Sequence, residues 1–142
     1  MNNSFKKKNT IELSTNQERR MILHITSHKD WEKAQLEGIY TAPSLKSEGF
    51  IHCSTVKQTV DTANIFFKGQ YGLVLLLIDE NKLESECKYE DPTGGGKHDP
   101  DAGKLFPHIY GSINISAVIK VVNFSPDENG MFELPKEILK CV

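Results

Sequence analysis

The sequence predicts an α+β fold with more strand than helix, for three reasons. Two segments with helical periodicity each follow a strand-like segment directly, which gives the order β-α-β-α-β. The run "GLVLLLID" at 72–79 is uninterrupted and apolar, as is typical of a central strand covered on both faces. Further strand-like segments then follow without a third clear helix. A chain of 142 residues has the size of one domain.

The first strand and helix are predicted from "MILHIT" at 21–26 and the residues after it. Residues 1–20 are rich in Asn, Ser, Lys and Thr and predict a flexible N-terminal tail. Ser27 is a plausible N-cap, with Asp30 in the position that a capping box usually gives to Glu or Gln. Gly38 is expected to end this helix.

A second strand is predicted at "GFIHCS", followed by a second helix. Thr55 and Gln58 form a T-x-x-Q capping box, and Val56 begins an apolar series at helical spacing. Gly69 is expected to end the helix.

Short strands are predicted beyond the central one. "CKYE" at 87–90 is a candidate, and "FPHIYGSI" and "AVIKVVNF" read as further strands. Between them, 91–104 is rich in Gly, Pro and charge, so it is a loop with the composition of a lid or of a disordered excursion. The single domain is expected to cover 21–136, with a C-terminal tail at 137–142.

Composition narrows the classes of partner. Lys and Arg number 17 against 19 Asp and Glu, so neither a nucleic-acid nor a membrane partner is expected. The longest apolar run is too short to cross a bilayer, and the N-terminus lacks the apolar region of a signal peptide. Three cysteines without C-x-x-C spacing favour a reducing compartment. A cytoplasmic protein is expected, and its oligomeric state is left open.

Two strand ends share one design. His24 and Thr26 are two residues apart in a strand, and so are His52 and Ser54, so each pair should share a face. A predicted helix start follows each pair, and helix starts favour anions. Together these groups predict a cradle for a phosphate, a pyrophosphate or a ribose. The alternative is that each histidine is a hydrogen-bonded core residue.

Other residues add to this candidate site. "FPHIYG" places His108 and Tyr110 on one strand face, and Glu90 offers a carboxylate just before the loop. Cys53 should point away from its neighbour His52, which favours a buried thiol over a nucleophile paired with a histidine. No zinc site is expected, since the histidines and cysteines lack close ligand spacing.

The stretches "LHITS", "EGFIHCS", "VLLLID", "KYE", "LFPHIYGSI" and "FELP" closely resemble the small bacterial family called domain of unknown function 952, over about 21–135. This resemblance implies an ADP-ribosyltransferase-like fold, with two short packed β-sheets and two helices that follow strands 1 and 2. "LHITS" is similar to the H-x-[TS] motif that holds the nicotinamide-side ribose of NAD. The order of motifs also looks like that of RNA 2'-phosphotransferases.

The resemblance implies a role for each candidate residue. NAD or a related nucleotide would be the small-molecule ligand, with His24, Thr26, Ser54 and Tyr110 as binding residues. His52, His108 and Glu90 would be the catalytic residues of an ADP-ribosyl or phosphoryl transfer. A non-catalytic module that senses a nucleotide or docks a partner is the alternative, because the domain lacks the arginines that grip RNA phosphates in the phosphotransferases.

Overall fold

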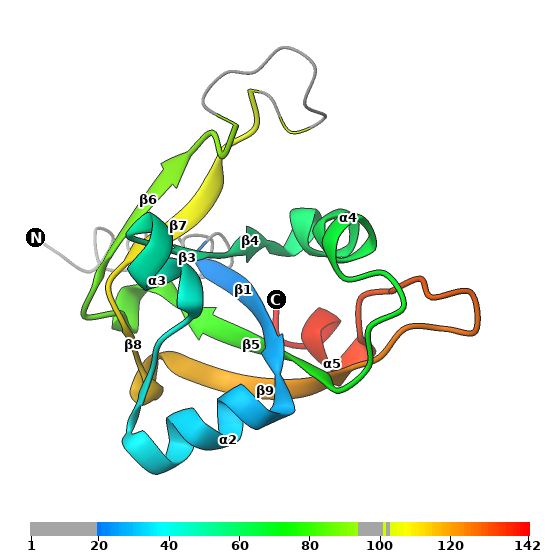
Figure 1. Cartoon of the computed structure of the whole chain (residues 1–142), viewed down its shortest axis with the longest axis horizontal. Helices are drawn as coiled ribbons and strands as arrows, with labels where there is room; N and C mark the ends of the chain where they lie inside the picture. The colour runs from blue at the N-terminus through cyan, green and yellow to red at the C-terminus, as the bar shows by residue number, and fades with distance from the viewer. Residues whose placement is uncertain (1–19, 94–100, 102) are drawn as a thin grey trace, which may run out of the picture.

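The computed structural model describes residues 20–93, 101 and 103–142, which form three small antiparallel sheets and four α-helices. The four-stranded sheet has the order β4-β1-β5-β9, the three-stranded sheet β3-β7-β6, and the two-stranded sheet β2-β8. The α+β class is therefore confirmed, but two sheets were expected and three are present (Figure 1). The strands are β1 (Met21–Ser27), β2 (Ile39–Tyr40), β3 (Ile51–His52), β4 (Ser54–Thr55), β5 (Leu73–Asp79), β6 (Glu86–Glu90), β7 (Phe106–Tyr110), β8 (Ile113–Asn114) and β9 (Val118–Phe124).

Strand β5 is the central strand that its apolar run predicts. All seven of its residues are buried, and it pairs with β1 along its whole length and with β9 on its other edge. Its alternate side chains enter two separate cores, which explains why the run has no polar interruption before Asp79. Each fully buried aliphatic side chain of this kind contributes about 1.5–3 kcal/mol to folding.

The two cores lie on opposite faces of the four-stranded sheet. One contains Val74, Leu76 and Ile78 of β5, and packs against α2 and the three-stranded sheet. The other contains Leu73, Leu75 and Leu77, and packs against α4 and α5. Figure 1 shows β6 and β7 on one side of the molecule and α4 and α5 on the other.

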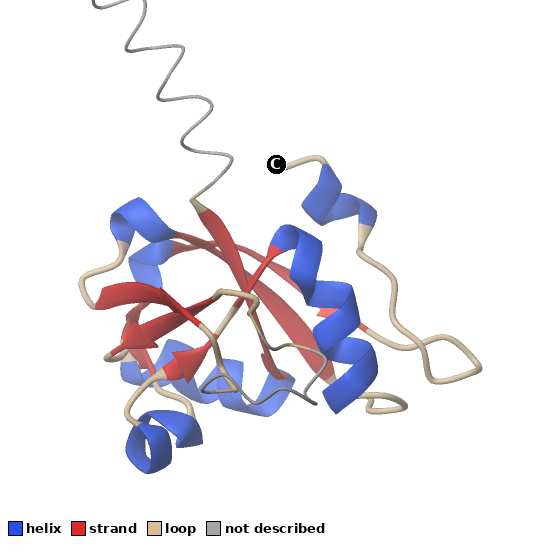
Figure 2. Cartoon of the chain, turned by 90° about the horizontal axis from the view of Figure 1, so that it is seen from above, coloured by secondary structure: helices blue, strands red, loops and turns tan. Residues whose placement is uncertain are grey.

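The caps of the two predicted helices are confirmed. Ser27 accepts a hydrogen bond from the backbone N–H of Asp30 at 3.0 Å, and Gly38 ends α2 with φ of 80°. Thr55 and Gln58 form the predicted capping box at the start of α4, although the helix ends before Gly69. The helices lie around the strands in Figure 2. They are α2 (His28–Glu37), α3 (Pro43–Glu48), α4 (Val56–Phe66) and α5 (Lys136–Leu139), with single 3₁₀ turns η1 (Glu80–Lys82) and η2 (Ile115–Ala117).

One helix, α3, lies where none was predicted, and α5 gives the C-terminal tail the short helix that was one of its two expected forms. Helix α3 begins with Pro43 and ends at Gly49, whose φ is 89°. Helix α5 falls mostly in the segment expected to be a tail, yet Ile138 is fully buried in the core beside α4. The segment 137–142 therefore packs on the domain in part. The tail predicted at 1–20 lies outside the described residues except for Arg20, and no helix of the described chain is long and apolar enough to span a bilayer.

Candidate functional site

A cleft of about 570 Å³ opens along the uncovered edge of β1. Strand β4 pairs with β1 only through Ile22 and Leu23, so within the described chain no strand covers that edge from His24 to Ser27. This volume is within the range of small-molecule sites. The lining residues are Leu23, His24, Ile25, Thr26, Ser27, Asp30, Tyr40, Ala42, Pro43, Ser44, His52, Cys53, Ser54, Thr62, Phe66, Phe67, Gln70, Leu73, Pro92, Thr93, Asp101, Phe106 and His108.

The cleft begins where the chain passes from one sheet to another. "GFIHCS" was expected to be one strand, but His52 belongs to β3 and Ser54 to β4, in different sheets. The backbone N–H of Cys53 still bonds to the carbonyl of Pro107 in β7, whereas Ser54 pairs with Leu23 of β1. The predicted common strand face of His52 and Ser54 is therefore wrong, but the crossing places both residues in the cleft wall.

His24 lines the cleft with both ring nitrogens engaged by the protein. Its Nδ1 lies 2.6 Å from the carbonyl oxygen of His52, and its Nε2 lies 2.7 Å from the Tyr40 hydroxyl. Burial lowers the pKa of His24 from 6.5 to about 4, because desolvation disfavours the charged ring. His24 is thus a neutral imidazole at pH 7. In this structure it presents no free nitrogen to a ligand.

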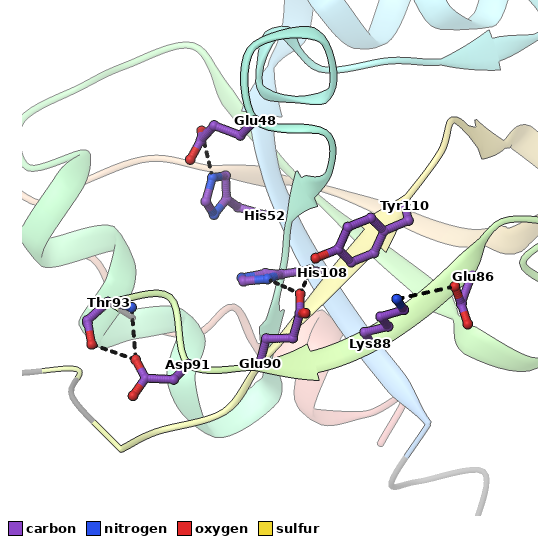
Figure 3. A network of polar contacts seen from close by, with 9 residues as sticks. All are labelled: Glu48, His52, Glu86, Lys88, Glu90, Asp91, Thr93, His108 and Tyr110. Atoms are coloured by element: carbon purple, nitrogen blue, oxygen red, sulfur yellow. Dashed lines mark hydrogen bonds and ion pairs between the residues drawn. The ribbon is translucent and has the colours of Figure 1, made fainter. Parts of the chain in front are cut away.

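His108 has the opposite arrangement, with one nitrogen held and the other without a partner. Its Nδ1 donates to Glu90 Oε1 at 3.0 Å, because an ionised carboxylate can only accept (Figure 3). Its Nε2 is buried and has no hydrogen-bond partner among the described residues. Such a nitrogen costs about 1–3 kcal/mol unless a ligand or a water satisfies it.

Glu90 is held by two donors and does not line the cleft itself. The Tyr110 hydroxyl donates to the same oxygen, Oε1, that accepts from His108. The bonds from Tyr110 and then His108 lower the pKa of the Glu90 carboxyl below its ordinary value. Glu90 raises the pKa of Tyr110 in return. The three groups lie together on one face of the three-stranded sheet (Figure 3).

Aromatic packing fixes the orientation of the His108 ring. Phe50 stacks on it with the ring centres 4.1 Å apart and the planes 16° apart. His52, its cross-strand neighbour, meets it edge-on at 5.4 Å. The Nε2 of His52 in turn bonds to Glu48 at 3.0 Å, at the end of α3 (Figure 3). His52 is far more exposed than His108, with 48% of its side chain accessible.

The two helix starts beside the cleft are already occupied by their own caps. The Ser27 side chain accepts a hydrogen bond from the backbone N–H of Asp30 at the start of α2. At the start of α4, the capping box of Thr55 and Gln58 likewise bonds backbone N–H groups. Asp30 also places a carboxylate in the first turn of α2 and at the cleft wall. No lysine or arginine occurs among the described lining residues, so the cleft wall offers little positive charge to a phosphate.

A carboxylate clamp holds the two ends of the segment that was predicted to be a lid. Asp91 accepts hydrogen bonds from the N–H and hydroxyl of Thr93 and from the N–H of Gly103. These bonds lower the pKa of Asp91 below its ordinary value. They hold Thr93, which lines the cleft together with Asp101. Residues 94–100 and 102, where the lid prediction mainly falls, lie outside the described residues.

Five of the seven predicted site residues meet at this cleft. His24, Thr26, His52, Ser54 and His108 line it. Glu90 and Tyr110 lie behind His108 and reach the cleft only through its ring.

Sequence reasoning missed Tyr40 and Phe50, which hold two of the cleft histidines. In the sequence, each is marked only as an aromatic residue shortly after a glycine, Gly38 before Tyr40 and Gly49 before Phe50. No cluster of three or more potential metal ligands occurs in the part of the chain that the structure describes.

The profile of the family described as "Protein of unknown function (DUF952)" matches residues 25–121, which include the whole of β1 after His24, the crossing at Cys53 and all of β7. The chain belongs to this family. No functionally curated protein matched it.

Solved structures of protein CC0527 from Caulobacter crescentus are similar to this DUF952 chain. Its crystal structure is 28% identical with a TM-score of 0.71, and the match covers 84% of this chain and 98% of that one. A solution NMR structure of CC0527 is 29% identical with a TM-score of 0.69, and covers 83% and 96%. The shared fold therefore extends over nearly the whole of CC0527.

Proposed function

We propose that this DUF952 protein binds a nucleotide of the NAD or ADP-ribose class in the cleft beside β1, and that His108 moves a proton there. The unpartnered Nε2 of His108 carries this proposal. A buried nitrogen at the wall of a cleft of about 570 Å³ is satisfied when a ligand hydroxyl or a water bonds to it. The resemblance of the first-strand motif to that of ADP-ribosyltransferases supports the ligand class.

The roles of the remaining residues follow from their contacts. Glu90 keeps the ring proton of His108 on Nδ1. Nε2 then carries the free lone pair that a general base requires. Tyr110 holds Glu90 in place, and Phe50 prevents rotation of the ring. His52 is the exposed imidazole at the same wall and would contact the part of the ligand nearer solvent.

A thermal-shift screen tests the proposal, with NAD, ADP-ribose, cyclic phosphates and 2'-phosphorylated RNA as ligands. A ligand at about 100 times its Kd adds about 2.7 kcal/mol of stability. For a domain of this size, the melting temperature then rises by roughly 5 °C or more. His108→Gln should reduce the shift, and His28→Gln, which alters an exposed histidine bonded to Asn123, should leave it unchanged. No shift with NAD or ADP-ribose would refute the proposed ligand class.

A non-catalytic nucleotide-binding module is the second candidate, and one observation favours it. The Glu90 carboxylate is occupied by His108 and Tyr110 and does not line the cleft, so it does not face a bound sugar directly. A transferase that stabilises positive charge on a ribose needs such a group at the sugar. Release of nicotinamide from NAD distinguishes the candidates: binding without release supports the module.

A further inference from the structure

Tyr40 joins two predicted site residues into one hydrogen-bonded chain. Its hydroxyl oxygen lies 2.7 Å from Nε2 of His24 and 3.0 Å from Oγ1 of Thr26. Tyr40 comes from β2 and is 2% exposed, whereas His24 and Thr26 share one face of β1. All three residues line the cleft. The positions of the protons in this chain decide which groups the cleft wall can bind.

The carbonyl of His52 determines which group donates and which accepts in each of these hydrogen bonds. A carbonyl oxygen can only accept, so Nδ1 of His24 carries a proton and donates to it. The buried ring is bonded to a carbonyl and a phenol, neither of which is charged, so nothing bonded to it compensates a second proton. The lowered pKa of His24 agrees with this. Nε2 is therefore a lone-pair acceptor, and Tyr40 donates to it.

Tyr40 has a single hydroxyl proton, and His24 uses it. The contact of 3.0 Å between Tyr40 and Thr26 must then use the proton of Thr26. Thr26 is left with lone pairs only toward the cleft. We infer that Thr26 accepts a hydrogen bond from a donor group of the ligand, a hydroxyl, amide or amine, and that Tyr40 is the positioning residue that sets this polarity.

Charge at the same wall agrees with a donor rather than a phosphate. A phosphate oxygen brings negative charge and lone pairs, and would meet the lone pairs of Thr26 and the nearby carboxylate of Asp30. The described lining residues include no lysine or arginine to offset this repulsion. The inference rests on the proposed nucleotide site and refines it: hydroxyl or amide groups lie against β1, and the phosphates lie farther out.

Ring NMR of the ligand-free protein tests the polarity. In a ¹⁵N-labelled sample at pH 7, His24 should show a protonated Nδ1 and an unprotonated Nε2. Tyr40→Phe should shift the Nε2 resonance, and the matched control Tyr89→Phe, which removes a phenol bonded to Glu80, should not. A protonated Nε2 would overturn the inference, because Tyr40 would then donate to Thr26 and free the Thr26 proton for the ligand.

Two small probes test the ligand group. Adenosine, which has ribose hydroxyls and no phosphate, should shift the Thr26 amide resonance, and inorganic pyrophosphate should not. Thr26→Val should weaken adenosine binding about fivefold to tenfold, the usual effect of losing one hydrogen bond, and Thr26→Ser should restore it. Tyr40→Phe should weaken it about fivefold, with a folded spectrum as the check on structure.

The two proposals fail in different ways. Three results would overturn the donor inference while leaving NAD or ADP-ribose binding intact. The Thr26 amide resonance could shift with pyrophosphate alone, it could shift with neither probe, or Thr26→Val could bind adenosine as tightly as the wild type. Absence of stabilisation by NAD and ADP-ribose would refute the ligand class, and the ring spectrum would still decide the polarity of Thr26.

Discussion

His24 should make the protein sensitive to mild acid, and this sensitivity can be measured without any ligand. The ring is buried and neutral, and burial holds its pKa at about 4. In the unfolded chain the same ring is in water with an ordinary pKa of 6.5. Between these values the unfolded state binds a proton that the folded state does not, so the free energy of unfolding falls as the pH falls.

The size of the effect follows from the two pKa values. A difference of one in pKa corresponds to about 1.4 kcal/mol. The drop from 6.5 to about 4 therefore corresponds to about 3 kcal/mol, lost progressively as the pH falls through this window and fully present above pH 6.5. For a domain of ordinary stability, 5–15 kcal/mol, that is a large fraction.

Urea unfolding at pH 7.0, 6.0, 5.0 and 4.5 provides the assay. His24→Gln cannot titrate, so its free energy of unfolding should change less over this range, by about 2–3 kcal/mol relative to the wild type. The lowered pKa values of Glu90 and Asp91 mean that their stabilisation is lost below about pH 4.5, outside the window. His28→Gln, which alters an exposed histidine bonded to Asn123, is the matched control for the loss of an imidazole. Equal pH dependence in His24→Gln and wild type would refute the neutral, buried state of His24.

Four further substitutions test the fold by urea unfolding at pH 7. Ile138→Ala should lower the free energy of unfolding by about 2–4 kcal/mol, since Ile138 is fully buried, and a change under 0.5 kcal/mol would show that α5 does not pack. Gly111→Ala should cost about 1–3 kcal/mol, because a Cβ there would overlap the Ser85 hydroxyl oxygen and the φ of 156° is unfavourable for a residue with a side chain. Gly38→Ala should cost only about 1 kcal/mol, because no atom lies within 4 Å of a Cβ at that position. A larger loss of stability in Gly38→Ala than in Gly111→Ala would contradict the packing around Gly111. Gln58→Ala should cost about 1 kcal/mol through the lost capping box, and no change would mean that the box is not formed in solution.

Local signals predicted much of this fold, and their success has a physical reason. The apolar run of β5 and the caps at Ser27 and Thr55 depend only on residues near in sequence, so periodicity and capping rules find them. Helix α3 could also have been predicted from the sequence, because Pro43 at its start and Gly49 after its end are typical helix-boundary residues. Its six residues were too short to show a helical period.

Long-range pairing explains what local signals missed. Nothing in "GFIHCS" indicates that Cys53 bonds to Pro107 while Ser54 pairs with Leu23, because both partners are distant in sequence. The contact of Tyr40 with His24 likewise depends on how β2 packs against β1. The candidate histidines were found by residue type, but the partner of each ring nitrogen, which decides its chemistry, came only from the structure.

The crossing at Cys53 both opens the cleft and requires a brace across it. Once the chain leaves β3 for β4, the edge of β1 beyond Leu23 loses its neighbour, and the two sheets could separate there. The bond from His24 to the carbonyl of His52 connects β1 to β3 across this split, and Tyr40 extends the connection to β2. Both ring nitrogens of His24 therefore stabilise the cleft wall and are not available to a ligand. His108 is bonded to Glu90 through Nδ1 only and keeps a ring nitrogen without a partner, which is why the proposed function assigns the proton transfer to His108 and not to His24.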